Sequence, residues 1–246
     1  MDAIARLTSR KIGFDYPSPT AKQLRALKQH SKASDCCRNP RIIGLNSYFH
    51  KGYNGALTTT IARESVVLAL ESVLQQLPRD YEFQVFDAFR TLAAQLALWD
   101  DIYSQQQRLN PNLSTDELRK ITRNFVAHPV YPPLSPVLPH NSGGAIDLTL
   151  ARNGKPLNMG TGFDEVSPMS ATQWFEQDYD SNSGLAKQTW EEIRNNRRLF
   201  FNLMKDAGFV NYKAEWWHYN LGNCSWADTL GVDWYYPSLE DEGYSI

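Results

Sequence analysis

Two segments of the chain combine histidine and carboxylate side chains in ways that suit metal binding. In the first, His140 ends a proline-rich stretch, Gly143 and Gly144 follow, and Asp147 lies in a predicted strand over 145–150. Because glycine lets the backbone turn tightly, the loop imidazole and the strand carboxylate can converge on one point. Nitrogen and oxygen donors of this kind suit a divalent ion such as zinc. Taken alone, the loose spacing is also typical of a surface turn followed by a strand.

The second segment reads Glu-Trp-Trp-His-Tyr over residues 215–219. Two tryptophans between Glu215 and His218 would exclude water, and such burial raises the pKa of a carboxyl group toward the range of a general base. Residues three apart on a flat strand face opposite sides, so we expect a bend or bulge between Glu215 and His218. The alternative is an aromatic core strand whose histidine has ordinary hydrogen-bond partners.

Together the two segments supply two histidines, one aspartate and one free glutamate. Catalytic zinc sites use three protein ligands and keep one position for water, whose pKa falls to about 7 on the metal. We therefore predict one zinc ion per chain, held by His140, Asp147 and His218, with Glu215 as the general base of a hydrolytic reaction. A metal-free hydrolase that uses two carboxylates is a remote alternative, which a chelator would distinguish.

Two further segments carry charged residues at predicted strand ends or in loops. Asp87 and Arg90 follow the strand over 81–86, where the guanidinium could stabilise an oxyanion and Asp87 could orient it or support a metal ligand. A glycine-rich loop ends at Asp164, whose carboxylate could hold a substrate ammonium. This loop lacks the lysine and the strand-to-helix setting of a phosphate-binding loop. A surface salt bridge and an ordinary loop aspartate are the simpler readings of these two segments.

The elements that must position these residues follow from hydrophobic periodicity and turn signals. Helices are predicted over 20–30, 62–77, 91–103, 118–125 and 184–207, and strands or strand-and-turn segments over 41–53, 81–86, 145–150 and 209–220. Five prolines make the stretch 128–139 irregular. Helices and strands do not alternate regularly, which favours an α+β fold. We predict an N-terminal extension over 1–40 and a single domain over 41–246.

The bulk composition excludes several classes of protein. The chain has 246 residues, a formal net charge of −2 and 42% hydrophobic residues, which is an ordinary globular mixture. The basic residues are scattered and no apolar run is long enough to span a bilayer, so we expect neither nucleic acid nor a membrane as partner. Three cysteines make a poor disulfide framework. We expect a cytoplasmic protein, or a periplasmic one if a leader has been removed; the oligomeric state is left open.

These segments, in this order, resemble the D-alanyl-D-alanine dipeptidases, zinc enzymes of vancomycin resistance and of cell-wall dipeptide scavenging. Their wider group includes peptidoglycan D,D-carboxypeptidases and the hedgehog signalling domain. The resemblance runs from about residue 46 to residue 219. Each matching segment alone is weak evidence, but the order of all the segments along the chain is specific to the family. The pieces are 87–90, Met159-Gly160, Phe163-Asp164, His140 with Gly143, Ala145 and 147–150, Asn196-Arg197-Arg198-Leu199, Met204, Gly208-Phe209, and 215–219.

The resemblance implies a role for each matching residue. His140, Asp147 and His218 would be the zinc ligands and Glu215 the general acid and base. Arg90 would stabilise the transition-state oxygen. Asp164 would bind the free amine of the substrate, and Asp87 is assigned to substrate binding with it. The implied fold is a small antiparallel sheet flanked by helices, with zinc on the sheet face. The implied substrate is a small D,D-dipeptide.

Departures from the family pattern leave alternatives open. Leu138 stands where the family usually has serine, a residue associated with the substrate end of the pocket. Thr91 replaces a frequent proline, and residues 1–40 and the acidic tail over 240–242 have no clear counterpart. The alternatives are a zinc D,D- or L,D-carboxypeptidase acting on longer muropeptides, and a zinc-containing binding domain of the same fold without activity. Retention of Glu215 and Arg90 favours an enzyme.

Overall fold

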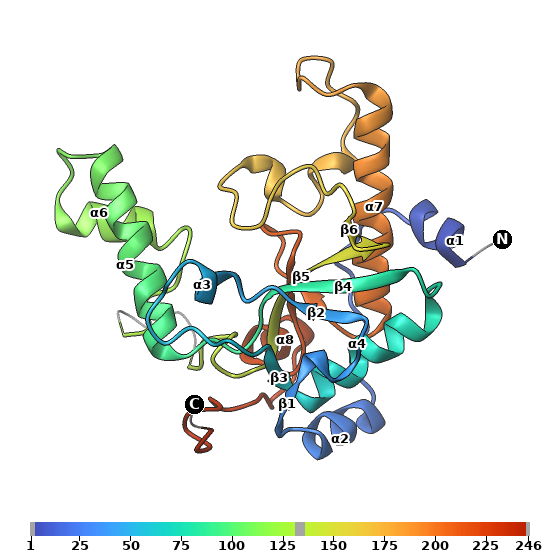
Figure 1. The fold of residues 1–246 in the computed structure, drawn as a ribbon, viewed down its shortest axis with the longest axis horizontal. Coiled ribbons are helices and arrows are strands. Elements are labelled where there is room, and N and C mark those ends of the chain that lie inside the picture. Colours follow the sequence, from blue (N-terminus) through green and yellow to red (C-terminus); the bar gives the residue numbers. More distant parts are fainter. Residues whose placement is uncertain (1–2, 131–135, 245–246) are drawn as a thin grey trace.

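A mixed sheet of six strands forms the centre of the protein in a computed structural model that describes residues 3–130 and 136–244 (Figure 1). The described residues form eight strands in all, of which six belong to this sheet. The eight are β1 (Ala33–Asp35), β2 (Ile42–Gly44), β3 (Ile61–Arg63), β4 (Tyr81–Asp87), β5 (Ala145–Arg152), β6 (Lys155–Pro156), β7 (Val210–Asn211) and β8 (His218–Asn220). The sheet order is β2-β4-β5-β8-β7, with β6 paired to β5, while β1 and β3 form a separate antiparallel pair.

The described residues form eight α-helices, which include the five predicted ones with boundaries shifted by up to six residues. They are α1 (Ala3–Ser9), α2 (Ala21–Gln29), α3 (Ser47–His50), α4 (Glu64–Gln76), α5 (Leu92–Leu109), α6 (Thr115–Thr122), α7 (Lys187–Asp206) and α8 (Cys224–Leu230). A capping box formed by Ser114 and Glu117 begins α6 at residue 115, three residues before the predicted start at residue 118. Helices α1, α3 and α8 were not predicted, because each has only four to seven residues and too short a hydrophobic pattern.

The α+β class is confirmed, but the sheet is not antiparallel throughout. Strand β2 pairs in parallel with β4, whereas β4, β5, β8 and β7 pair antiparallel in turn. The chain between β2 and β4 contains α3, β3 and α4, which is long enough for the crossover that a parallel pair requires. The edge strand therefore departs from the predicted antiparallel arrangement.

The main core lies between one face of the sheet and the helices α4 and α7. In β5, Ile146, Leu148 and Leu150 point into this core, while Asp147 belongs to the other face. This is the alternation that the sequence predicts. Helix α4 contributes Val66, Val67, Leu70, Val73 and Leu74 to the core, and α7 contributes Leu199, Phe200, Leu203 and Met204. The apolar face fixes the sheet against the helices and leaves the opposite face for polar groups.

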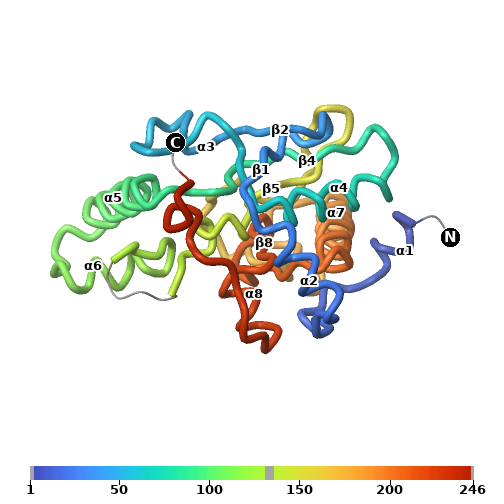
Figure 2. Tube along the Cα trace, turned by 90° about the horizontal axis from the view of Figure 1, so that it is seen from below, coloured from blue at the N-terminus to red at the C-terminus, as the bar shows by residue number. Residues whose placement is uncertain are grey.

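The two ends of the chain pack against this body. Leu7, Leu27 and Cys36 from the first forty residues join the main core, and the division at residue 41 stays a prediction. Figure 2 shows the C-terminal segment (red) passing close to β1, where Tyr244 contacts the ring of Phe89 at a centroid distance of 5.5 Å. In the predicted irregular stretch 128–139, residues 131–135 lie outside the described residues. Within the described ranges, no helix has the length and apolar character needed to cross a bilayer.

Candidate metal centre and active site

The sheet register places three of the candidate residues side by side. Asp147 in β5 lies opposite His218 in β8 and, on its other side, opposite Asp87 in β4. Residues directly opposite one another in antiparallel strands project from the same face of the sheet. Asp87, Asp147 and His218 therefore project together from the face that does not pack against the main core.

A bulge in β4 brings Asp87 to this face. Val85 pairs with Leu148 on the core face, and simple alternation would send Asp87 to the core as well. The register shifts between Val85 and Asp87, so that Phe86 is the extra residue and Asp87 pairs with Asp147. The ring of Phe86 stacks on Phe163 with centroids 4.5 Å apart. The bulge thus re-aims a carboxylate that would otherwise be buried among apolar side chains.

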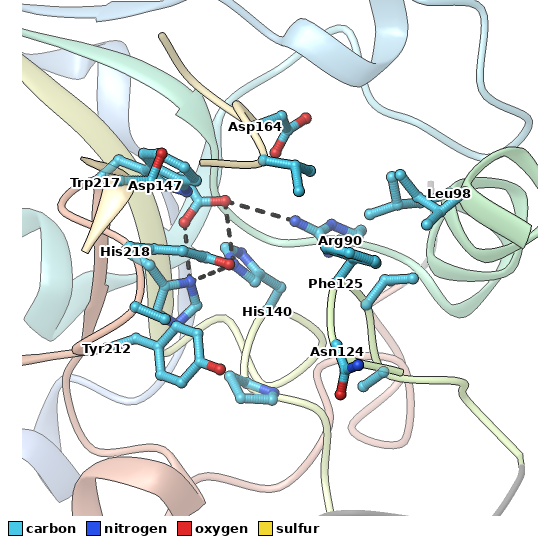
Figure 3. A pocket seen from close by; sticks show the side chains of 18 of the residues that line it. Arg90, Leu98, Asn124, Phe125, His140, Asp147, Asp164, Tyr212, Trp217 and His218 are labelled. Atoms are coloured by element: carbon cyan, nitrogen blue, oxygen red, sulfur yellow. Dashed lines mark hydrogen bonds and ion pairs between the residues drawn. The ribbon is translucent and has the colours of Figure 1, made fainter. Parts of the chain in front are cut away.

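His140, Asp147 and His218 converge into one cluster (Figure 3). His140 Nε2 lies 3.3 Å from Asp147 Oδ2 and 3.2 Å from His218 Nδ1, and His218 Nδ1 lies 2.9 Å from Asp147 Oδ1. One donor atom from each residue lies within 4.8 Å of the others. Two histidines and one aspartate are a donor set that zinc and other first-row ions accept.

The outer nitrogens of both histidines already have oxygen acceptors. His140 Nδ1 lies 2.7 Å from the Ala88 carbonyl oxygen, and His218 Nε2 lies 3.1 Å from Asn220 Oδ1. Donation from these outer N–H groups leaves the lone pair of each neutral imidazole on the inner nitrogen. Two inward lone pairs and a carboxylate then face one another, an arrangement that needs a cation between them. The donor set and its outer partners therefore fit a metal ion.

Without a metal, protons would take the role of that cation. Burial raises the pKa of the Asp147 carboxyl group, but the nearby His140 and hydrogen bonds from both imidazoles lower it well below its usual range. Burial lowers the pKa of His218, but the hydrogen bond to Asp147 and its charge more than offset this and raise it. The cluster therefore attracts positive charge strongly, which is the electrostatic condition for binding a divalent ion.

A turn over residues 215–218 leads into β8, with the His218 backbone N–H donating to the Glu215 carbonyl oxygen at 3.4 Å, so the predicted bend between Glu215 and His218 is present. The Glu215 backbone N–H donates to the Tyr212 carbonyl oxygen at 3.0 Å, and the predicted long strand over 209–220 is thereby divided into β7 and β8. Burial raises the pKa of Glu215 to about 7, which the charge of His218 opposes. The flanking Trp216 is held by a 2.8 Å hydrogen bond from its indole nitrogen to Thr161 Oγ1. A carboxyl group with this pKa exchanges protons readily near neutral pH.

Arg90 is buried behind the cluster and is held on several sides. Its Nη2 lies 2.8 Å from Asp87 Oδ2 and 3.6 Å from Asp147 Oδ2, and its Nη1 donates to Gln95 Oε1 at 3.0 Å. The guanidinium also stacks on the Tyr48 ring at 4.7 Å. A fixed, permanently charged donor beside the cluster can stabilise a developing oxyanion. Asp87 orients this donor and lies 3.2 Å from His140 Nδ1.

Asp164 reaches the site from a loop that α7 braces. The buried guanidinium of Arg197 donates to the carbonyl oxygens of Met159, Met169 and Ala171 at 2.6–2.8 Å. Asp164 itself has a left-handed backbone with φ of 59°. These contacts hold the loop that brings Asp164 to the same cavity as the other candidate residues (Figure 3).

A cavity of about 540 Å³ joins these groups. Its lining includes six of the seven candidate residues, namely Arg90, His140, Asp147, Asp164, Glu215 and His218. Asp87 is not in the lining, and its contacts with Arg90 and His140 favour a supporting role over direct contact with a ligand. Leu138, at the position where the resembling family has serine, also lines the cavity and supplies an apolar wall there. Residues of α5 and of the segment after α6 complete another wall.

Sequence reasoning missed three side chains that support the site. Asn220 follows His218 by two residues on the same strand face, so strand alternation was a usable signal. Tyr48 donates to Asp164 Oδ1 at 3.2 Å and accepts from Arg90 at 3.4 Å, but no motif in the sequence marks it. Asn141 donates its side-chain N–H groups to the Arg90 carbonyl oxygen and to Glu240 of the acidic tail. The tail therefore contacts the loop that carries His140.

Comparison with known proteins places the chain in a family. Residues 46–233 match the family model described as D-Ala-D-Ala dipeptidase. A protein named D-alanyl-D-alanine dipeptidase from Synechocystis is 31% identical over 163 residues, which cover 63% of this chain and 65% of that protein. A protein of the same name from Enterococcus faecalis is 27% identical over 69% of this chain and 77% of its own length. The Escherichia coli protein of this name is 29% identical over 56% of this chain and 53% of its own length.

The matched segment contains every candidate residue, from Asp87 to His218, and excludes the first 45 residues and the C-terminal segment after residue 233. It covers well over half of the chain, although the alignment spans only 65% of the length of the Synechocystis protein. The protein belongs to the D-Ala-D-Ala dipeptidase family of metallopeptidases.

Proposed function

We propose that the protein is a zinc-dependent peptidase that hydrolyses the D-alanyl-D-alanine dipeptide in the degradation or recycling of cell-wall precursors. The convergence of His140, Asp147 and His218 beside Glu215 and Arg90 on one cavity carries this proposal. The names of the relatives support the choice of substrate. The cavity volume of about 540 Å³ leaves room for a molecule as small as a dipeptide.

His140, Asp147 and His218 would hold one zinc ion on the sheet face. A bound zinc ion supplies Lewis-acid activation of water, and three protein ligands leave a position open for that water. Asp87, Ala88 and Asn220 keep the imidazoles in the orientation that presents their inner nitrogens.

Glu215 would move the proton during hydrolysis. It accepts a proton from the attacking water as the carbon–oxygen bond forms, and it donates this proton to the leaving amine nitrogen as the carbon–nitrogen bond breaks. A pKa of about 7 suits both halves of this transfer near neutral pH. Arg90, fixed by Asp87 and Gln95, stabilises the negative charge on the former carbonyl oxygen.

Asp164 would bind the free ammonium group of the dipeptide at the far side of the cavity. A carboxylate that meets an ammonium there leaves little room for a chain extended at the amino end. A D,D-carboxypeptidase is a second candidate, because Asp164 already has a cationic partner, Lys51, at 2.9 Å. An anchor that is already neutralised selects less strongly for a free amine.

The test is release of free D-alanine from D-Ala-D-Ala, with a chelator and then with zinc restored. L-Ala-L-Ala and amino-blocked D-Ala-D-Ala serve as parallel substrates. We expect chelator-sensitive cleavage of the free D,D-dipeptide in preference to both. Cleavage of only blocked or longer peptides would support the carboxypeptidase, and zinc binding without any cleavage would indicate a non-catalytic binding domain. Activity that resists the chelator would refute the metal role.

A further inference from the structure

A lysine side chain reaches the carboxylate that we assign to the substrate ammonium. Lys51 directly follows α3, and its Nζ lies 2.9 Å from Asp164 Oδ2. The same ammonium lies over the aromatic rings of Tyr48 and Phe163, at 5.2 and 5.8 Å from their centroids. A carboxylate and two aromatic faces are the surroundings that a bound ammonium group prefers. Lys51 therefore already provides for Asp164 the kind of contact that a substrate amine would make.

We propose that Lys51 is a specificity-determining residue, an internal ammonium that competes with the substrate's free amine for Asp164. The proposal rests on the dipeptidase function proposed above and refines it. When a dipeptide binds, its ammonium must either displace Lys51 or share the carboxylate with it, and two cations on one carboxylate repel each other. Lys51 therefore weakens the binding of substrates with a free amine and leaves blocked substrates unaffected.

Asp164 cannot readily turn away from Lys51 to avoid this competition. Its other carboxylate oxygen, Oδ1, accepts a hydrogen bond from the Tyr48 hydroxyl at 3.2 Å. That hydroxyl in turn accepts from Arg90 Nη2 at 3.4 Å, so the carboxylate is tied to the buried part of the site. The stacking of Phe163 on Phe86 fixes the adjacent residue of the loop. Lys51 is the mobile partner, since four single bonds carry its ammonium.

The size of the competition follows from solvent exposure. The side chain of Lys51 is 45% exposed and that of Asp164 is 30% exposed, so water and salt screen the pair. Arg90 adds positive charge on the buried side, while Asp87, Asp147 and Glu215 add negative charge. Ion pairs with this exposure change equilibria modestly. We expect removal of the Lys51 charge to improve binding of the free dipeptide by about two- to fivefold.

The test compares Lys51→Met with the wild-type zinc enzyme on free and amino-blocked D-Ala-D-Ala. Methionine keeps an unbranched chain of similar length and removes the charge. We expect KM for the free dipeptide to fall about two- to fivefold, with kcat unchanged and with the blocked substrate unaffected. Lys51→Arg keeps the charge and should keep the wild-type KM. Lys187→Met removes a more exposed lysine of α7 that also pairs with a carboxylate, Glu191, and it controls for a general change of surface charge.

A double variant tests whether the effect passes through Asp164. In an Asp164→Asn background, Lys51→Met should no longer change KM, because the competition needs the carboxylate. Either an unchanged or a raised KM in the single variant would overturn the competition. A raised KM would mean that Lys51 positions Asp164 for substrate binding, and an unchanged KM would mean that Lys51 does not influence substrate binding. A wild-type enzyme without chelator-sensitive D-Ala-D-Ala cleavage would instead overturn the proposed function, and the inference with it.

Discussion

The two ends of the cavity are built in different ways. At the end proposed to bind the metal (the metal end: His140, Asp147 and His218), two of the three residues lie on paired strands and the Asp147 side chain is only 4% exposed. At the end proposed to bind the substrate ammonium (the ammonium end: Asp164 and Lys51), both residues lie outside helices and strands, and both side chains are partly exposed. Sheet register controls the first geometry, whereas long-range contacts from α7 hold the loop of the second.

In the proposed mechanism, the metal end carries out the reaction and the ammonium end selects the substrate. Metal ligands need positions defined within fractions of an ångström, and paired strands with a packed apolar face provide that precision. A carboxylate that meets a flexible ammonium group tolerates more variation, so a loop suffices. Changes at the ammonium end should therefore alter which substrate binds, while changes at the metal end should alter whether any substrate reacts.

The largest effect is expected for Glu215→Gln, which removes the group that we propose transfers the proton. We expect kcat to fall about a thousandfold while zinc stays bound, because glutamine keeps the shape of the side chain but cannot accept the proton. Steady-state kinetics and zinc content measure the two halves of this prediction. Glu192→Gln, on the exposed side of α7, should behave as the wild type. Substantial turnover in Glu215→Gln would refute the general-base role.

A smaller effect is expected for Asn220→Ala, which removes the acceptor of the His218 Nε2 hydrogen bond. We expect zinc affinity to fall by about 10- to 100-fold, because supporting partners of metal-binding histidines contribute on that scale. Competition with a chromogenic chelator measures the affinity. Asn182→Ala, in an exposed turn, is the matched control. Unchanged affinity would mean that the metal end does not depend on its outer hydrogen bonds.

A still smaller and more selective effect is expected for Asp164→Asn. Loss of a charged hydrogen-bond partner should raise KM for free D-Ala-D-Ala about tenfold, with zinc content and kcat close to wild type. Amino-blocked D-Ala-D-Ala should show no such increase. An equal increase for both substrates would contradict the ammonium role and would weaken the contrast between the two ends.

The smallest effect concerns stability rather than turnover. Glu176 accepts from Arg198 Nη2 at 2.6 Å and from the Ile12 backbone N–H at 3.0 Å, linking α7 to the N-terminal segment. Burial raises the pKa of Glu176, but these hydrogen bonds outweigh burial and lower it. A lowered pKa stabilises the fold above the unfolded value of about 4.3, and this contribution disappears as pH falls through the folded value.

Arg198→Met should therefore lower Tm by about 2–4 °C at pH 7, for a loss of ~1 kcal/mol. Thermal melts followed by circular dichroism from pH 7 to pH 3 measure this. The difference from the wild type should shrink as pH falls below the unfolded value of about 4.3 and through the lowered folded pKa of Glu176. Arg10→Met removes an exposed pair with Asp206 and should change Tm little at any pH. A constant difference across the pH range would exclude Glu176 as its source.

The sequence by itself determined the elements whose patterns are long and local. The apolar periodicity of α4 and α7, the alternation of β5 and the capping box of α6 predict those elements with errors of a few residues. It also named the residues of the candidate site, since His140, Asp147, His218 and Glu215 were singled out by residue type and spacing and line one cavity. Such features can be read locally because they depend on spacing along the chain.

Only the tertiary structure decided how these residues meet. The bulge at Phe86 turns Asp87 toward the site, and the parallel pairing of β2 depends on a crossover through α4. The contacts of Tyr48 with Arg90 and of Lys51 with Asp164 join residues that lie 42 and 113 positions apart. Partners so distant in sequence leave no local pattern, because register and packing of the whole sheet bring them together.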